Sequence, residues 1–246
     1  MANTDYKSPD ALMRHLKDNG ISISGSSQKQ QLINTGYFHG YKGYRFFVSS
    51  SNRLPFTSYN EINATIQYDT KLKSLLYGKM MFIETALKNI ALNTIMSEID
   101  SSSIYDMYDK AISSYKNAPA GTREDIKKKY QNNKLNLQGS IQNAIAHNDV
   151  VYDTRFKKMD PSRPMKQCLI LEMGMPYINF KTIGDYIILI CYYLKLLKVS
   201  KTEIKSFIRE FEKITREYES SVNPNVSAIT IHPDLFSRLN ILKNSI

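Results

Sequence analysis

Cysteine and histidine are scarce in this sequence, which has two cysteines and four histidines in 246 residues. Cys168 and Cys191 form no CxxC pair and have no histidine nearby at ligand spacing, which disfavours a zinc module and a disulfide scaffold. No carboxylate–histidine cluster has metal-ligand spacing, so we expect no metal and no other cofactor. Neither GxxxxGK[ST] nor GxGxxG occurs, which disfavours a P-loop or Rossmann nucleotide enzyme.

Long apolar runs are also missing. The most apolar stretch, residues 187–197, is interrupted by Lys195 and is far shorter than the roughly 20 residues that span a bilayer. The first ten residues lack the apolar core of a signal peptide. We therefore expect a cytoplasmic protein with no membrane partner.

Positive charge, by contrast, is in excess. Lys and Arg total 33 against 23 Asp and Glu, which gives a formal net charge of +10 and favours a polyanionic partner such as nucleic acid. Apolar residues make up 42% and charged residues 23%, close to the globular average, so wholesale disorder is excluded.

Helical periodicity dominates the chain and predicts a mainly α fold. Helices are expected over residues 9–18, 59–97, 101–117, 123–147, 165–173, 181–198 and 233–242, with one more that ends at Asn223-Pro224. The helix over 59–97 has an apolar stripe through Leu72, Leu76, Met80, Ile83, Leu87 and Ile90. The helix before Asn223 has one through Ile204, Phe207, Phe211, Ile214 and Tyr218.

The N-terminal part is less regular. Residues 21–31 are small and polar and are interpreted as a loop. Residues 32–48 are rich in aromatics and glycine, and a short hairpin is open there. We predict one domain over residues 1–246, with an irregular N-terminal region (1–58) packed on a helical core (59–220) and a C-terminal tail (221–246).

His147 is the histidine best suited to chemistry. It lies in the segment IQNAIAHNDVVYD, with Asn143 four residues earlier on the same helical face. An aligned partner lets a histidine act as acid or base near neutral pH, and an Asn amide can fix its ring or hold a phosphate. The alternative is a buried helix end where both side chains satisfy backbone groups.

The other three histidines are not expected to carry chemistry. His15 and His232 are interpreted as solvated or capping, and His39 is not expected to be catalytic.

This segment resembles the signature of HEPN ribonucleases, which is Arg, then Asn, Asp or His, three variable residues and His. More narrowly, residues 142–147 (QNAIAH) resemble the Arg-Asn-x-x-Ala-His string of the abortive-infection family of AbiD and AbiF type. Residues 35–44 (TGYFHGYKGY) resemble that family's Gly-Tyr-Tyr-Arg-Leu-Ser-Gly-Tyr string. They match it at Gly36 and Tyr37 and, with one extra residue, at Gly43 and Tyr44. Residues 69–88 resemble its helix with a charged start and an inward Ile-Glu.

The resemblance covers most of residues 30–155 and implies a HEPN-like helical bundle. It implies a phage-defence toxin that is a metal-independent endoribonuclease and a homodimer, with RNA as substrate. AbiF-like members are associated with a small non-coding RNA that can restrain the toxin. In HEPN ribonucleases the Arg is thought to hold the scissile phosphate, while the His moves a proton during attack of the 2′-hydroxyl.

The Arg of this motif falls on Gln142. Gln can hydrogen-bond a phosphate but carries no charge, and charge-assisted bonds are roughly twice as strong as neutral ones. Catalysis should therefore be weakened. A natural loss of activity, a variant with another Arg recruited and an engineered change all remain open.

Spacing adds a constraint on this motif. Gln142 and His147 are five residues apart, so on an ideal helix they point about 140° from each other. They converge only if the helix ends between them or if two copies face each other. The second arrangement is usual in HEPN proteins and implies a homodimer here.

Three residues near the motif have open roles. Glu84 lies beside Ile83 on the expected inner stripe, where a carboxylate is costly unless paired. It could orient His147 or a basic group, or it could be structural and pair with a Lys or Arg. Asp149 and Tyr152 could shape the cleft, although helix exit and solvent contact are favoured for both.

Basic residues suggest where RNA could lie. Lys127, Lys128 and Lys129 precede the motif, while Arg155, Lys157, Lys158 and Arg163 follow it. A second row steps by four residues along one helix: Lys201, Lys205, Arg209 and Lys213. Such rows can follow a phosphate backbone. For the second row a solvated face is slightly favoured, since Glu203, Glu210 and Glu217 share its helix.

Aromatic side chains gather in the N-terminal region at Tyr37, Phe38, Tyr41, Tyr44, Phe46 and Phe47. They could stack unpaired bases, but a packed small core is favoured. Two alternatives to the ribonuclease stay open: a non-catalytic RNA-binding module, and a helical protein–protein adaptor.

Overall fold

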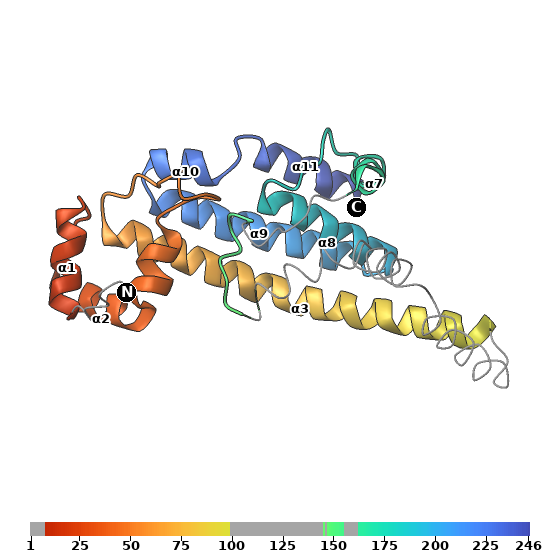
Figure 1. Cartoon of the computed structure of the whole chain (residues 1–246). Coiled ribbons are helices and arrows are strands. Elements are labelled where there is room, and N and C mark those ends of the chain that lie inside the picture. Colours follow the sequence, from red (N-terminus) through yellow and green to blue (C-terminus); the bar gives the residue numbers. More distant parts are fainter. Residues whose placement is uncertain (1–7, 99–144, 146, 155–161) are drawn as a thin grey trace, which may run out of the picture.

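One long helix forms the centre of the structure. In the computed structural model, which describes residues 8–98, 145, 147–154 and 162–246, helix α3 runs from Tyr59 to Glu98 (Figure 1). The predicted apolar stripe is buried over Leu72, Leu76, Met80 and Ile83. Beyond Ile83 the stripe becomes more exposed: Leu87 is half-buried and the side chain of Ile90 is 52% exposed.

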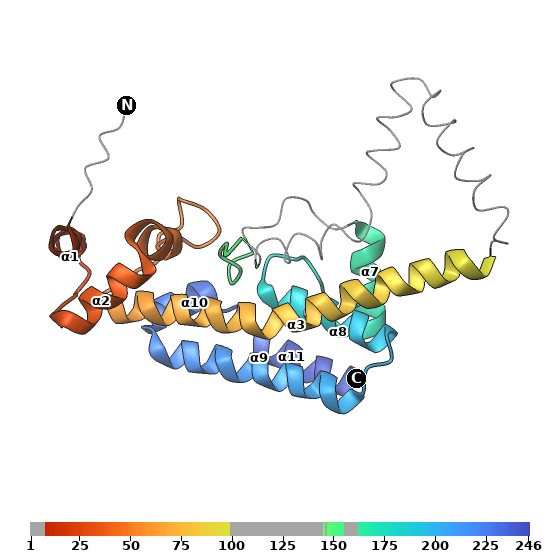
Figure 2. The same cartoon turned by 90° about the horizontal axis from the view of Figure 1, so that it is seen from below.

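Helix α9 (Lys201–Ser221) packs antiparallel along α3, and the two helices share the longest interface of the fold (Figure 2). The predicted stripe of α9 is buried throughout. At its centre the ring of Tyr68 stacks on that of Tyr218, with centroids 4.4 Å apart and planes 3° from parallel. Burial raises the pKa of the Tyr68 phenol. Ion pairs at the edge, such as Lys71–Glu217 at 2.7 Å, flank this apolar contact.

Helix α8 (Ile183–Leu196) is buried on most sides, as its apolar sequence predicts. It packs against α3, α9 and α7 (Arg163–Met173). Asp185 of α8 forms a buried ion pair with Arg238 of α11 (Leu235–Ser245), and Arg238 also donates to the carbonyl of Tyr177 at 3.0 Å. The C-terminal tail is thereby fixed to the helical core.

A short helix absent from the prediction, α10 (Pro224–Thr230), follows α9. Asn223 caps it by accepting from the backbone N–H groups of Asn225 and Val226, at 3.0 and 3.1 Å. Pro224 occupies the first turn, where a missing N–H costs nothing. The Asn-Pro pair therefore ends one helix, as predicted, and also starts the next.

The N-terminal region is helical rather than irregular. Helix α1 (Pro9–Asp18) is confirmed, with Ser8 as its cap. The interpretation of residues 21–31 as a loop is correct only for residues 21–24, because α2 spans Gly25–Thr35. Leu32 is the only buried residue of α2, so the sequence of this helix shows no apolar periodicity from which a helix could be predicted. Residues Tyr37–Lys42 form a π-helical turn, η1, and only the end of the region approaches a hairpin, through an isolated antiparallel bridge between Phe46 and Arg53.

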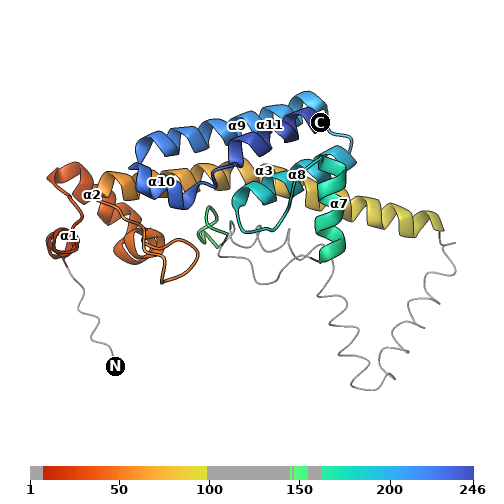
Figure 3. The same cartoon turned by 90° about the horizontal axis from the view of Figure 1, so that it is seen from above.

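The described residues contain no strand, only isolated bridges, and the predicted mainly α fold is confirmed. Viewed from above, α7 crosses the end of α8 while α1 and α2 lie at the opposite end of the molecule (Figure 3). None of the described helices is both long and apolar enough to cross a membrane. The predicted helices over 101–117 and 123–147 lie outside the described residues, apart from the end of the second.

Glu61 joins the start of α3 to the corner between α9 and α10. Its carboxylate accepts from the backbone N–H of Thr57 at 2.7 Å, of Ser58 at 3.0 Å and of Asn223 at 2.9 Å. Burial acts to raise the pKa of Glu61, but these hydrogen bonds outweigh it and the pKa is lowered. The ionised form is therefore the one that stabilises the fold.

We predict that Glu61→Gln costs about 1–3 kcal/mol of unfolding free energy at pH 7, because donors lose a charged acceptor. A group with a lowered folded-state pKa contributes stability above its ordinary pKa of 4.5 and loses it as pH falls through the folded-state value. The variant should therefore lose less stability than the parent between about pH 5 and about pH 3. Urea unfolding across this pH range measures the unfolding free energy of the parent, of Glu61→Gln and of the control Glu219→Gln, which changes an exposed glutamate. Equal slopes of unfolding free energy against pH in these three proteins would contradict the stabilising role of the Glu61 carboxylate.

Candidate functional site

The site is organised by Asp69, a fully buried carboxylate on α3. Its Oδ1 accepts from the backbone N–H groups of Val151 and Tyr152, both at 2.8 Å. Its Oδ2 accepts from the hydroxyl of Tyr44 at 2.8 Å and pairs with Nζ of Lys73 at 2.9 Å. A buried charge is stable only when paired and hydrogen-bonded, and every bond of Asp69 serves that need.

Lys73 extends this network toward the surface. One turn after Asp69 on α3, its Nζ also donates to Oδ1 of Asn148 at 2.8 Å. Asn148 has a φ of +53°, a left-handed conformation that Asn adopts more readily than most residues. We call Asp69, Lys73, Tyr44 and Asn148 the Asp69 cluster. It holds the backbone on the C-terminal side of His147 at three points: residues 148, 151 and 152.

His147 is exposed and lies in a turn, immediately before the fixed Asn148. Ile145 is still helical, and the N–H of Asn148 donates to the Ile145 carbonyl at 3.1 Å. The helical assignment at Ile145 therefore does not extend to His147, while Gln142 lies outside the described residues. The alternative of a buried helix end does not fit an exposed imidazole.

The three segments used for the family resemblance meet at the Asp69 cluster. Tyr44 ends the Gly-Tyr segment, Asp69 opens the charged helix segment, and Val151 and Tyr152 follow His147. These segments are far apart in sequence, so their convergence comes from the tertiary structure. Sequence similarity and geometry thus select the same place.

Tyr152 departs from its expected role. It is buried rather than solvent-exposed, with its ring stacked on Tyr44 (centroids 6.0 Å apart) and beside Tyr68 and Phe47.

Asp149, by contrast, is exposed to solvent, as favoured. Tyr41 and Tyr44 are also buried, so the aromatic residues of this region form mainly a packed core, as favoured.

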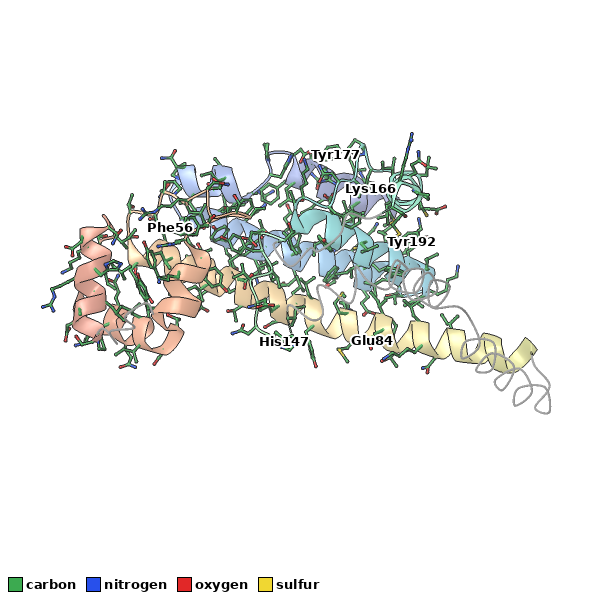
Figure 4. All side chains as sticks on the ribbon, in the orientation of Figure 1. Phe56, Glu84, His147, Lys166, Tyr177 and Tyr192 are labelled. Carbon is green, nitrogen blue, oxygen red and sulfur yellow. The ribbon has the colours of Figure 1, made fainter. Side chains whose placement is uncertain are left out.

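Glu84 lies away from His147 along α3 (Figure 4). It forms an ion pair with Lys88 one turn later, the structural arrangement left open by the sequence. Lys73, which holds Asn148, is eleven residues before Glu84, or about 16 Å along the helix axis. Contact between Glu84 and His147 is therefore not part of this arrangement.

The second basic row is on the far side of α3 from the His147 turn. Figures 2 and 3 both show α3 between α9 and residues 147–154. Lys201 and Arg209 are exposed and Lys205 is half-buried. Three glutamates on α9 are paired: Glu203 with Lys79, Glu217 with Lys71, and Glu210 with Lys213, the last cation of the row, at 3.9 Å.

The remaining predicted residues lie outside the described chain: Gln142, Asn143, Lys127, Lys128, Lys129, Arg155, Lys157 and Lys158. Arg163 is exposed at the start of α7. Among the described residues, no group of three or more His, Cys, Asp or Glu could hold a metal ion.

Sequence reasoning missed Asp69 and Lys73 as site residues, although a signal was present. Asp69 is three residues before Leu72 and seven before Leu76, which places it on the apolar stripe of α3. Lys73 follows at i+4, the spacing of a helical ion pair. A carboxylate that extends an apolar stripe is a candidate for a buried structural charge.

These features define a mainly helical protein in which a buried ion pair presents a histidine turn at the surface. The family model described as Abi-like protein matches residues 30–165, more than half of the chain, and all three segments that meet at the Asp69 cluster. The chain belongs to this Abi-like family, which supports a role in abortive infection, a defence against phage. No curated protein and no solved structure matches it.

We predict that Asp69→Asn lowers the unfolding free energy by about 2–4 kcal/mol, because an amide N–H₂ would face Tyr44 and Lys73, which are both donors. Denaturant unfolding measures this loss. Hydrogen exchange at Val151 and Tyr152 should accelerate at the same time.

The matched control is Asp10→Asn, which removes the same charge from an exposed pair with Lys29 at 2.8 Å. Such a surface pair contributes about 1 kcal/mol or less. Equal losses in the two variants would show that the Asp69 cluster does not hold the turn.

Proposed function

We propose that this Abi-like protein is an RNA-directed toxin of HEPN type, with His147 as the group that moves a proton in metal-independent cleavage of RNA. The observation that carries the proposal is the exposed His147 in a turn held by the Asp69 cluster. The buried charged network fixes the residues that follow His147, which supports the proposal because acid–base catalysis requires a histidine on a well-ordered part of the chain.

Gln142 takes the place of the phosphate-binding Arg in this proposal. It can donate a neutral hydrogen bond to a phosphate, so residual binding is retained while stabilisation of the transition-state charge is reduced. A homodimer would bring a second copy of the motif to the same cleft. A small non-coding RNA that occupies the basic surface would restrain the toxin.

Cleavage of a mixed RNA pool tests the enzymatic part. Three purified proteins are compared without added metal: the chain as given, Gln142→Arg, and Gln142→Arg with His147→Ala. We expect Gln142→Arg to cut at least about 100-fold faster than the parent, the size of effect seen when one transition-state donor is lost. The double variant should be inactive.

Two controls sharpen this comparison. Gln131→Arg adds the same charge outside the motif and should leave the rate unchanged. Circular dichroism establishes that each variant is folded. Absence of cleavage in all folded variants would favour the second candidate, a non-catalytic RNA-binding module, and would count against a ribonuclease.

RNA binding has its own observation, the row of Lys201, Lys205 and Arg209 on α9. Glu203, Glu210 and Glu217 of this helix pair with other lysines, and within the described part of the chain these three cations form no ion pair. Their charge is therefore available to a phosphate backbone.

We predict that changing all three cations to Gln weakens binding of single-stranded RNA and lowers the slope of log K against log salt by about 2, at roughly 0.7 per phosphate contact. The control changes Lys29, Lys71 and Lys79 to Gln, which removes three charges that are already paired. Fluorescence anisotropy over a salt series gives both slopes. Absence of binding by the parent protein would favour the protein–protein adaptor.

A further inference from the structure

A cavity of about 630 Å³ lies apart from His147, between the N-terminal region and the C-terminal helices. Four segments far apart in sequence line it: residues 47–52, Thr154, residues 180–182 and residues 229–232. Its volume is within the range of roughly 300–1,000 Å³ that small-molecule sites have.

The backbone around this cavity is strained. Five described residues other than glycine have positive φ, and three of them line the cavity: Val48 at +64°, Thr154 at +58° and Phe180 at +58°. Val and Thr are β-branched, and such residues rarely adopt this conformation. Strain of this kind persists only where the surroundings enforce it, and it concentrates at ligand sites.

The walls are braced against each other, which maintains the strain. Asp153, fully buried, accepts from the backbone N–H of Val48 at 3.0 Å. The hydroxyl of Thr154 donates to the carbonyl of Lys181 at 3.3 Å. The cavity is therefore formed before any ligand arrives.

The lining has a polar and an apolar part. Lys181 supplies a cation, and the described lining residues include no carboxylate to neutralise it. The Oγ1 of Thr182 is buried and makes no hydrogen bond within the described part of the chain. Phe47 and Ile229, both half-buried, supply apolar surface.

We propose that this cavity binds a nucleoside monophosphate, either free or as an unpaired nucleotide of an RNA chain. Lys181 binds the phosphate, and the base lies against Phe47 and Ile229. An uncompensated cation beside aromatic and hydroxyl groups suits a ligand with one anionic end and a flat apolar body. This inference does not depend on the ribonuclease proposal, because His147 is not part of the lining.

Isothermal titration calorimetry of the full chain with AMP and UMP tests the proposal. Ribose 5-phosphate lacks the base, and uridine lacks the phosphate, so each removes one half of the ligand. We expect mononucleotide to bind at least about tenfold more tightly than either fragment. Absence of nucleotide binding, or equal affinity for ribose 5-phosphate, would overturn the proposal.

Two substitutions locate the binding. Lys181→Gln should weaken mononucleotide binding about tenfold, the effect of replacing a charged bond by a neutral one, and Phe47→Ala should weaken it severalfold by removing apolar surface against the base. Lys17→Gln on α1 makes the same charge change away from the cavity and should leave the affinity unaltered. If Lys181→Gln and Lys17→Gln behave alike while both remain folded by circular dichroism, the nucleotide binds elsewhere and the assignment fails.

A competition experiment separates the two sources of the nucleotide. A six-nucleotide single-stranded RNA that displaces AMP from the parent protein, but binds Lys181→Gln weakly, identifies the ligand as part of an RNA chain. Failure of the RNA to displace AMP identifies a free nucleotide. Both results require the cavity to bind nucleotide.

Discussion

The carboxylate of Asp69 is the constraint on which the candidate site depends. It lies inside the apolar stripe of α3, where burial of a carboxylate is costly unless donors satisfy both of its oxygens. Those donors come from the N-terminal region through Tyr44, from α3 through Lys73 and from the chain after His147 through two backbone N–H groups. One buried charge therefore fixes three segments relative to each other, and the residues that follow the exposed His147 are part of that arrangement.

Apolar periodicity predicted the helices that have a continuous buried face. The stripe of α9 and the apolar sequence of α8 each indicate their helix because burial and pattern coincide. Helix α2 was missed because Leu32 is its only buried residue, so the pattern has no period to detect. Helix α10 was missed because the pair Asn223-Pro224 was interpreted only as the end of α9, whereas Asn223 also caps the start of α10.

The site was predictable only in its local part. His147 could be selected from a short motif, whereas its supports could not, since Asp69 and Lys73 become site residues only through contacts across about 80 positions. Glu84 illustrates the converse. An inward carboxylate was anticipated on α3 at Glu84, but the described buried carboxylates of this helix are Glu61 and Asp69, while Glu84 pairs with Lys88 near the surface. A pattern of residues indicates which side chains share a face, but it does not show which of them meets another segment.

The separation between Asp69 and the N–H groups it binds has a consequence for when the site forms. The bond to Val151 joins positions 82 residues apart, and its closure carries the entropy cost of a long loop. Contacts between residues that are so far apart in sequence are slow to form during folding. A partly synthesised chain that has exposed α3 but not residues 148–152 lacks the N–H donors of Val151 and Tyr152, so the Asp69 cluster forms only after that part of the chain has been made.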